Sequence, residues 1–296
     1  MSGHGHHDHG NHAHHGHHGA DEDHEHDRGL SYDLPVLARR RMIRLLAGAS
    51  LVPLAACTTD DAPTSSSATA GTSSSASSSS SSSSSAECAT IPDETAGPYP
   101  ADGSNGVNVL KESGVVRSDI RSSFGNSAGG TAEGVPLTVT LTVVDAASGC
   151  GTPKTGAAVY LWHCDRAGDY SLYTEGVTDE NYLRGVQETD DKGQVTFTSI
   201  FPGCYKGRWP HIHFEVYGSL ADATAATSTT NTSQLAFPKD VCDTVYATDG
   251  YGDSVGNLAE LSLDTDMIFR DGYDHQLAAT EGSADKGYTA TLTVPV

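Results

Sequence analysis

Apolar and hydroxyl-bearing residues alternate with a period of two along several stretches of the chain. The clearest are residues 135–144, 194–200 and 288–294, in which apolar residues alternate mainly with Thr. Because successive side chains of a strand point to opposite faces of a sheet, this period predicts strands with one buried and one solvated face. Glycine-containing turns, such as the one at 191–193, separate these stretches.

Helical periodicity is poor in the same part of the chain, and we expect at most one short helix, around residues 220–227. Residues 88–296 comprise about 209 residues, which is long enough for one substantial core. A β-sandwich is the economical way to bury the apolar faces of such strands. The sequence therefore predicts an all-β protein whose folded part is a single β-sandwich domain over residues 88–296.

The N-terminal residues 1–27 have a composition unlike the rest of the chain. They are almost entirely His, Gly, Asp, Glu and Asn and hold eleven of the fifteen histidines. Such a segment cannot bury a core, and we expect it to be a disordered leader. Metal chelation by the histidines is the alternative interpretation.

Residues 28–57 have the features of an export signal. The segment 39–44, Arg-Arg-Arg-Met-Ile-Arg, matches a twin-arginine signal, and the apolar run after it is too short for a good membrane span. The run ends in Leu-Ala-Ala-Cys57, typical of a lipobox, in which the cysteine is diacylated and becomes the new N-terminus. We therefore expect an exported, cell-surface lipoprotein, anchored through Cys57 to the outer face of the cytoplasmic membrane. The other interpretation is a buried helix with a chance cysteine.

Residues 58–87 are mostly Ser, Thr and Ala, with an unbroken serine run at 77–85, and predict a flexible tether. The domain that follows carries 28 acidic residues against 12 Lys and Arg, a formal charge of −16. This charge argues against nucleic acid as a partner. The oligomeric state stays open, a homodimer included.

Candidate chemistry is concentrated in residues 201–214, Phe-Pro-Gly-Cys-Tyr-Lys-Gly-Arg-Trp-Pro-His-Ile-His-Phe. On an extended strand, His211 and His213 point to the same face, about 6–7 Å apart. Two imidazoles in that arrangement can share one metal ion. Pro210 just before them is typical of the start of a strand. The motif alone is weak, since the polar face of a surface strand produces it by chance.

A second cluster strengthens the metal interpretation. Residues 159–171 run from an apolar strand into a turn at Gly168 and present Tyr170 directly after it. Together with residues 201–214, this resembles the intradiol ring-cleavage dioxygenases, whose ferric iron is held by two tyrosinates and two histidines. Tyr170 matches the tyrosine after the turn, and Tyr173 is the alternative phenolate nearby.

The resemblance extends to further site residues. Tyr205 matches the tyrosine of the Pro-Gly-x-Tyr segment, and Arg208 matches the active-site arginine of the family. Residues 95–99, Thr-Ala-Gly-Pro-Tyr, resemble the segment that opens the family's domain. Residues 232–238 resemble a later strand, with Gln234 at a substrate-binding, pocket-lining position.

The resemblance also implies a reaction. With Fe(3+) as cofactor, both atoms of O2 would enter a catechol-type diol to give a muconate-type diacid. The implied axial ligands are Tyr205 and His213, and the equatorial ligands are Tyr170 and His211. Tyr205 would leave the metal and accept a substrate proton, and Arg208 would stabilise negative charge.

Other functions compete with this one. A non-catalytic module on the same fold would capture iron or a phenolic ligand at the cell surface, and an adhesion domain on a serine stalk is a third interpretation. His163 and His275 match no ligand position, and we expect them to be structural. The identity of the diol stays open.

Five cysteines fall in the predicted domain. Disulfides can persist after export to an oxidising compartment, although sequence alone cannot fix their pairing. We favour Cys204–Cys242 and Cys88–Cys150, with Cys164 reduced. A zinc-binding cluster is the rival, but no Cys-x-x-Cys spacing supports it.

Overall fold

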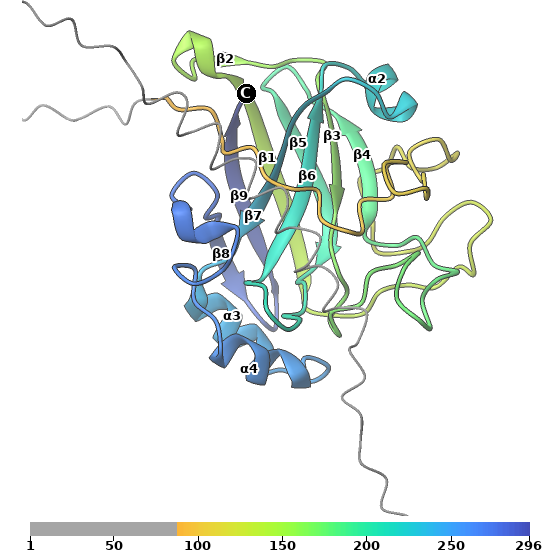
Figure 1. Ribbon diagram of the computed structural model, residues 1–296, viewed down its shortest axis with the longest axis vertical. Helices are drawn as coiled ribbons and strands as arrows, with labels where there is room; N and C mark the ends of the chain where they lie inside the picture. The colour runs from red at the N-terminus through yellow and green to blue at the C-terminus, as the bar shows by residue number, and fades with distance from the viewer. Residues whose placement is uncertain (1–87) are drawn as a thin grey trace, which may run out of the picture.

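The computed structural model describes residues 88–296, in which two β-sheets are surrounded by short helices and long loops (Figure 1). The leader, the export signal with Cys57 and the serine-rich tether lie outside the described residues. What the sequence predicts for those segments therefore stays a prediction.

The first sheet consists of five strands, which are β1 (Pro136–Asp145), β2 (Thr152–Pro153), β5 (Gln194–Ile200), β8 (Ala279–Ser283) and β9 (Gly287–Pro295). β1 is central: β5 pairs with it antiparallel and β9 pairs with it parallel. β2 pairs antiparallel with the end of β1, and β8 pairs antiparallel with β9. The three stretches with period-two alternation thus become β1, β5 and β9, as the sequence predicts.

The second sheet consists of four antiparallel strands in the order β4-β3-β6-β7, which are β3 (Ala158–Trp162), β4 (Arg184–Glu188), β6 (His211–Tyr217) and β7 (Thr229–Ala236). All five residues of β3 and all seven of β6 are buried. Both faces of these central strands are therefore covered, one by the first sheet and the other by loops.

The core between the sheets is apolar. Side chains of β1 and β5 pack with side chains of β3 and β6 in one cluster, which includes Leu137, Val139, Leu141, Phe197, Val159, Leu161, Ile212, Phe214 and Val216. These residues are the apolar half of each alternating strand, so the period-two pattern produces the packing of one sheet on the other. The sandwich-like arrangement agrees with the predicted fold class.

The outer face of the four-stranded sheet is covered by the N-terminal loops of the domain. Ala101, Val109 and Leu110 pack there against Tyr160 and Trp162 of β3 in a second cluster. In Figure 1 this covering segment, coloured orange to yellow, runs across the strands toward β4. The side chains on the outer face of these strands are therefore enclosed as well, and the candidate site lies between this face and the covering loops.

Helices are more numerous than the sequence indicated. α2 (Leu220–Ala225) lies where one short helix was expected, and the 3-10 turns η2 (Ala146–Ser148) and η3 (Phe269–Asp271) are brief. However, α3 (Lys239–Tyr246) and α4 (Gly252–Ala259) were not predicted. Each has eight residues, about two turns, which is too short for apolar residues to show a clear helical period. None of the helices in residues 88–296 is long and apolar enough to cross a membrane.

The cysteines correct one of the two predicted pairings. Cys88 and Cys150 form the expected disulfide, at a sequence separation of 62. Cys204 and Cys242 do not pair: both are free and buried, as is Cys164. The Cys204 thiol instead donates to the carbonyl of Arg208 at 3.6 Å. The side chains of Cys204 and Cys242 both belong to the apolar core, where a buried thiol packs as a small hydrophobic group.

Candidate metal centre

Strand β6 positions the predicted histidine pair. His211 and His213 lie on its outer face and are 2% and 3% exposed. In the register of the sheet, His213 lies between Trp162 of β3 and Gln234 of β7. The Trp162 ring stacks on the imidazole of His213, with 5.0 Å between centroids and 7° between planes. The neighbouring strands thus hold this imidazole in one orientation.

The two imidazoles present their Nε2 atoms to each other at 3.1 Å. Nδ1 of His211 lies 2.6 Å from the carbonyl oxygen of Trp209. Since a carbonyl can only accept, Nδ1 of His211 carries the proton and its Nε2 presents a lone pair. Burial, with a smaller effect of Arg208, lowers the pKa of His211 well below its usual range, and burial does the same for His213. Both side chains are therefore neutral, as metal ligands must be.

Tyr205, in the loop between β5 and β6, adds an oxygen to this pair. Its hydroxyl lies 3.2 Å from Nε2 of His211. Gly168 lies against it: a Cβ at Gly168 would stand 3.1 Å from Cβ of Tyr205, and the glycine has φ +96°. A side chain at 168 would therefore be strained and crowded, which explains a glycine just before Tyr170.

Tyr170 is the fourth predicted ligand and lies next to Tyr205 and His213. Its ring centroid lies 5.9 Å from that of Tyr205 and 6.4 Å from that of His213. The hydroxyl of Tyr170 is buried and has no hydrogen-bond partner. Burial, followed by the neighbouring Tyr205, raises the pKa of Tyr170 well above its usual range. The chain alone therefore leaves a buried phenol unsatisfied, which is a cost that a ligand would remove.

These four side chains fit a hard, highly charged metal ion. Three donor atoms, from Tyr205, His211 and His213, approach one another closely, and the unsatisfied Tyr170 hydroxyl lies beside them. A bound cation would replace the phenolic protons and reverse the pKa shift that burial causes. Within residues 88–296, no group of three or more His, Cys, Asp and Glu could hold a metal. A metal at this position would therefore depend on the tyrosines.

Arg208 and Gln234, which the family resemblance singles out, contact each other beside the histidine pair. Nη2 of Arg208 donates to Oε1 of Gln234 at 2.6 Å, and Nε of Arg208 donates to Asp266 at 3.0 Å. Gln234 in turn donates to the carbonyl of Thr95 at 3.0 Å. All of these side chains are buried, so Arg208 is not a surface arginine.

The segment 95–99 closes the site from above the sheet. A Cβ at Gly97 would lie 3.3 Å from Cε1 of His213, and the φ of this glycine is +71°. The ring of Tyr99 packs on Tyr170 at 4.9 Å and on Tyr173 at 5.1 Å. The segment therefore lies directly against two of the predicted ligands.

Several contacts of the site had no sequence signal. Arg184 of β4 is fully buried and donates to Ser171, next to Tyr170, and to the carbonyl of Tyr99. Asp266 lies 58 residues after its partner Arg208. No local pattern marks either position in the sequence.

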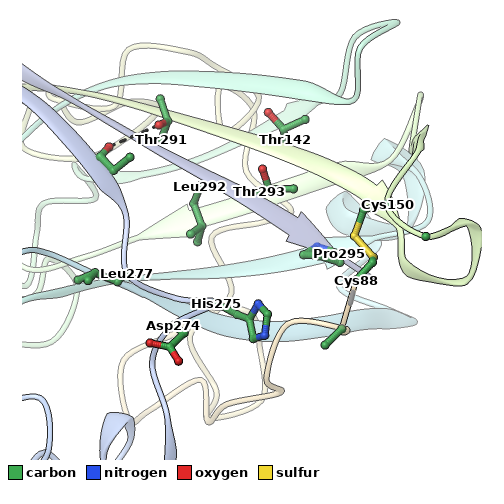
Figure 2. Close-up of a pocket in the computed structure, with 13 residues that line it drawn as sticks. Cys88, Thr142, Cys150, Asp274, His275, Leu277, Thr291, Leu292, Thr293 and Pro295 are labelled. Carbon is green, nitrogen blue, oxygen red and sulfur yellow. Dashed lines mark hydrogen bonds between the residues drawn. A yellow bond between two sulfur atoms is a disulfide. The ribbon is translucent and has the colours of Figure 1, made fainter. Parts of the chain in front are cut away.

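His163 and His275, which match no ligand position, and Tyr173, the alternative phenolate, have other surroundings and partners. Nε2 of His163 pairs with Ser199 at 2.7 Å and Nδ1 with the carbonyl of Cys164 at 2.7 Å, which fits a structural role. The hydroxyl of Tyr173 donates to Asn105 and accepts from the backbone N–H of Ala101. A separate hollow of about 470 Å³ is lined by both cysteines of the Cys88–Cys150 disulfide, and Figure 2 shows its lining residues. His275 lines that hollow, whereas none of the predicted metal ligands does.

Part of this chain is similar to known dioxygenases. A family model described as dioxygenase matches residues 117–251, which include the four predicted ligands. A chlorocatechol 1,2-dioxygenase of Rhodococcus opacus is 38% identical over 56 residues, which are 19% of this chain and 22% of that protein. The chain therefore aligns with about a fifth of that relative's length.

Comparison with solved structures supports the fold through one match. An intradiol ring-cleavage dioxygenase from Tetranychus urticae superposes with a TM-score of 0.51 at 25% identity, over 62% of this chain and 87% of that one. The dioxygenase domain of a dioxygenase and carbohydrate-binding protein fusion from Streptomyces sp. SirexAA-E gives a TM-score of 0.45 at 25% identity, over 70% of this chain and 98% of that one.

Proposed function

Because the chain belongs to the intradiol ring-cleavage dioxygenase family, we propose that it is a ferric dioxygenase that opens the ring of a catechol-type diol. Both atoms of O2 would be inserted, and the bond between the two hydroxyl-bearing carbons would break to give a muconate-type diacid. The observation that carries the proposal is the approach of Tyr205, His211 and His213 beside the unsatisfied hydroxyl of Tyr170.

Four side chains would hold the iron: Tyr170, Tyr205, His211 and His213. Two phenolates would offset part of its charge, and two imidazoles would stay neutral, as their lowered pKa values favour. When bound, ferric iron would supply a Lewis acid that draws electron density from the diol and makes the ring reactive toward O2.

The remaining chemistry belongs to the chain itself. The hydroxyl oxygen of Tyr205 is the atom we expect to take a proton from the diol, since a phenol oxygen can both donate and accept. Arg208, fixed by two partners, would stabilise negative charge on the substrate. Burial of the site and the covering segment 95–99 would keep water away from the reacting ring.

Oxygen uptake tests this function. Iron-loaded protein is mixed with catechol, protocatechuate or hydroxyquinol in an oxygen electrode, and the product is identified by its absorption and mass. We expect one O2 consumed per diol with at least one member of the panel. Tyr173→Phe, which removes a hydroxyl bonded to Asn105 and to the backbone of Ala101, is the matched control and should keep full activity.

A binding module on the same fold is the competing function, and the same experiment separates the two. A diol that shifts the visible spectrum of the iron protein without oxygen uptake would identify a binding protein. A protein that neither binds a diol nor consumes oxygen would exclude both functions.

The cellular location is a further part of the proposal. We propose export through the twin-arginine signal and anchoring through Cys57, on the sequence pattern of residues 28–57. Cys57→Ala should move the protein from the membrane fraction to a soluble or uncleaved form, and changing Arg39 and Arg40 together to Lys should block export. A wild-type protein without lipid would contradict the anchor.

A further inference from the structure

Asp266 is the charged partner of Arg208, and nothing in the sequence motifs points to it. It lies in the loop between α4 and η3, and its side chain is 0% exposed, against 5% for Arg208. Its Oδ2 accepts from Nε of Arg208 at 3.0 Å. Removing two charges from water is costly, so a pair this deep persists only where its geometry and remaining hydrogen bonds are well satisfied.

The carboxylate of Asp266 is itself held by the backbone. Besides Arg208, Oδ2 accepts the N–H of Trp209 at 2.7 Å. Oδ1 accepts the N–H groups of Ile268 and Phe269 at 2.8 and 3.2 Å. Four donors on two oxygens use most of the carboxylate's acceptor capacity and fix its position.

The guanidinium of Arg208 therefore has two anchors on different parts of the fold. Asp266 holds Nε from the loop after α4, and Gln234 of β7 holds Nη2. Gln234 is fixed in turn by the carbonyl of Thr95. Since the guanidinium is planar and rigid, two anchored nitrogens determine where the whole group points.

The same carboxylate reaches a predicted metal ligand through the backbone of one residue. The N–H of Trp209 binds Asp266, and the carbonyl of Trp209 accepts from Nδ1 of His211 at 2.6 Å. Asp266 thus fixes the residue whose carbonyl selects the tautomer of His211. One buried side chain connects the arginine and a histidine of the site.

We propose that Asp266 is the positioning residue of this centre: it orients Arg208 toward the substrate and holds the Trp209 backbone that orients His211. Its effect on turnover rests on the proposed function, whereas its hold on Arg208 does not. The two effects can therefore be tested separately.

The first test needs no turnover. In the full-length protein, the exchange of the Arg208 Nε–H with solvent is followed by NMR and compared with that of Arg121, whose Nε binds the exposed Asp119. We expect exchange at Arg208 to be slower by about 10-fold or more, because opening a buried contact is rarer than opening an exposed one. Equal rates in the wild-type protein would overturn the proposal, whatever happens in any variant.

The second test uses Asp266→Asn, with Asp243→Asn as the control. Asp243 pairs with Lys239 on the exposed side of α3, and its variant should behave like the wild type. Asp266→Asn should lower kcat by about 10–100-fold, the usual effect of a residue that orients a metal site, with KM and iron content little changed. Asp266→Glu, which keeps the charge but moves it, should also lower kcat.

A double-mutant cycle separates positioning from a general structural role. In an Arg208→Lys background, Asp266→Asn should lower kcat by less than it does in the wild type, because the contact with Arg208 is already altered and only the hold on the Trp209 backbone is left to lose. Independent, additive losses would overturn the proposal. If Asp266→Asn does not fold, Asp266→Glu and the wild-type exchange rates decide it. If the wild type shows no turnover with any diol, the proposed function fails, while the exchange measurement still decides the position of Arg208.

Discussion

The two faces of strand β6 carry opposite kinds of residue, although both are buried. Ile212, Phe214 and Val216 face the first sheet and pack in the apolar core. His211, His213 and Glu215 face the covering loops. Burial raises the pKa of Glu215 to about 7 and lowers those of both histidines. The inner face therefore stabilises the fold, while the outer face encloses polar groups at a cost, which is typical of a functional site.

The largest expected effects come from the tyrosines beside the outer face. If Tyr205 accepts the substrate proton, Tyr205→Phe should spare most iron binding but lower turnover by about 10²–10⁴-fold, as other losses of a general base do. Tyr170→Phe should weaken iron retention more, because the Tyr170 phenolate would balance the ferric charge. Stopped-flow spectra and iron content of both variants check this. Equal effects of both changes on iron and on turnover would mean that the ligand roles are assigned wrongly.

On the inner face, Phe214→Ala should cost about 3–5 kcal/mol in the free energy of unfolding, because it leaves a cavity in the packed core. His213→Gln is the matched change on the outer face, and in the metal-free protein it should cost clearly less, since glutamine still occupies much of the imidazole's place and leaves a smaller cavity. Urea unfolding of both variants makes the comparison. A larger cost at His213 would contradict the division between the two faces.

The Cys88–Cys150 disulfide should contribute about 2–4 kcal/mol, because it closes a long loop in the unfolded chain. Replacing both cysteines with Ser should lower the unfolding free energy by that amount. Cys204→Ser should not lower the unfolding free energy through the loss of a disulfide, because Cys204 is free. Peptide mapping without reductant should find Cys88–Cys150, and finding Cys204 joined to Cys242 would restore the pairing that the structure contradicts.

A smaller effect is expected at His163, which is buried but outside the centre. Burial lowers the pKa of His163 from 6.5 to about 4. The unfolded chain therefore binds a proton between pH 6.5 and 4 that the folded chain does not, so stability falls as the pH falls through this range. Between pH 7 and 5 the loss should be about 2 kcal/mol.

The control for His163 is the exposed His275. In His163→Gln, this part of the acid sensitivity should be absent, while His275→Gln should keep the wild-type pH dependence. Thermal unfolding across the pH range measures it. If stability depends on pH in His163→Gln as it does in the wild type, His163 is not buried as a neutral imidazole.

The sequence predicted those features of the fold and the site that depend on residues close together in the chain. The alternation in β1, β5 and β9 follows from one buried and one solvated face, and the His-x-His pair follows from the same geometry in β6. Two-turn helices such as α3 and α4 leave too few positions for a pattern. Asp266 could not be found, because its contact with Arg208 joins residues 58 apart through the fold. The pairing of Cys204 with Cys242 failed for the same reason: spacing along the chain does not determine the geometry between two thiols.

The central claim is that Tyr170, Tyr205, His211 and His213 hold one ferric ion. Titration of the purified protein with ferric iron, followed by visible absorption and metal analysis, tests it most directly. We predict one iron per chain and a tyrosinate-to-iron charge-transfer band that shifts in each Tyr→Phe variant and disappears when both tyrosines are replaced. A colourless protein that still contains stoichiometric iron would contradict the claim.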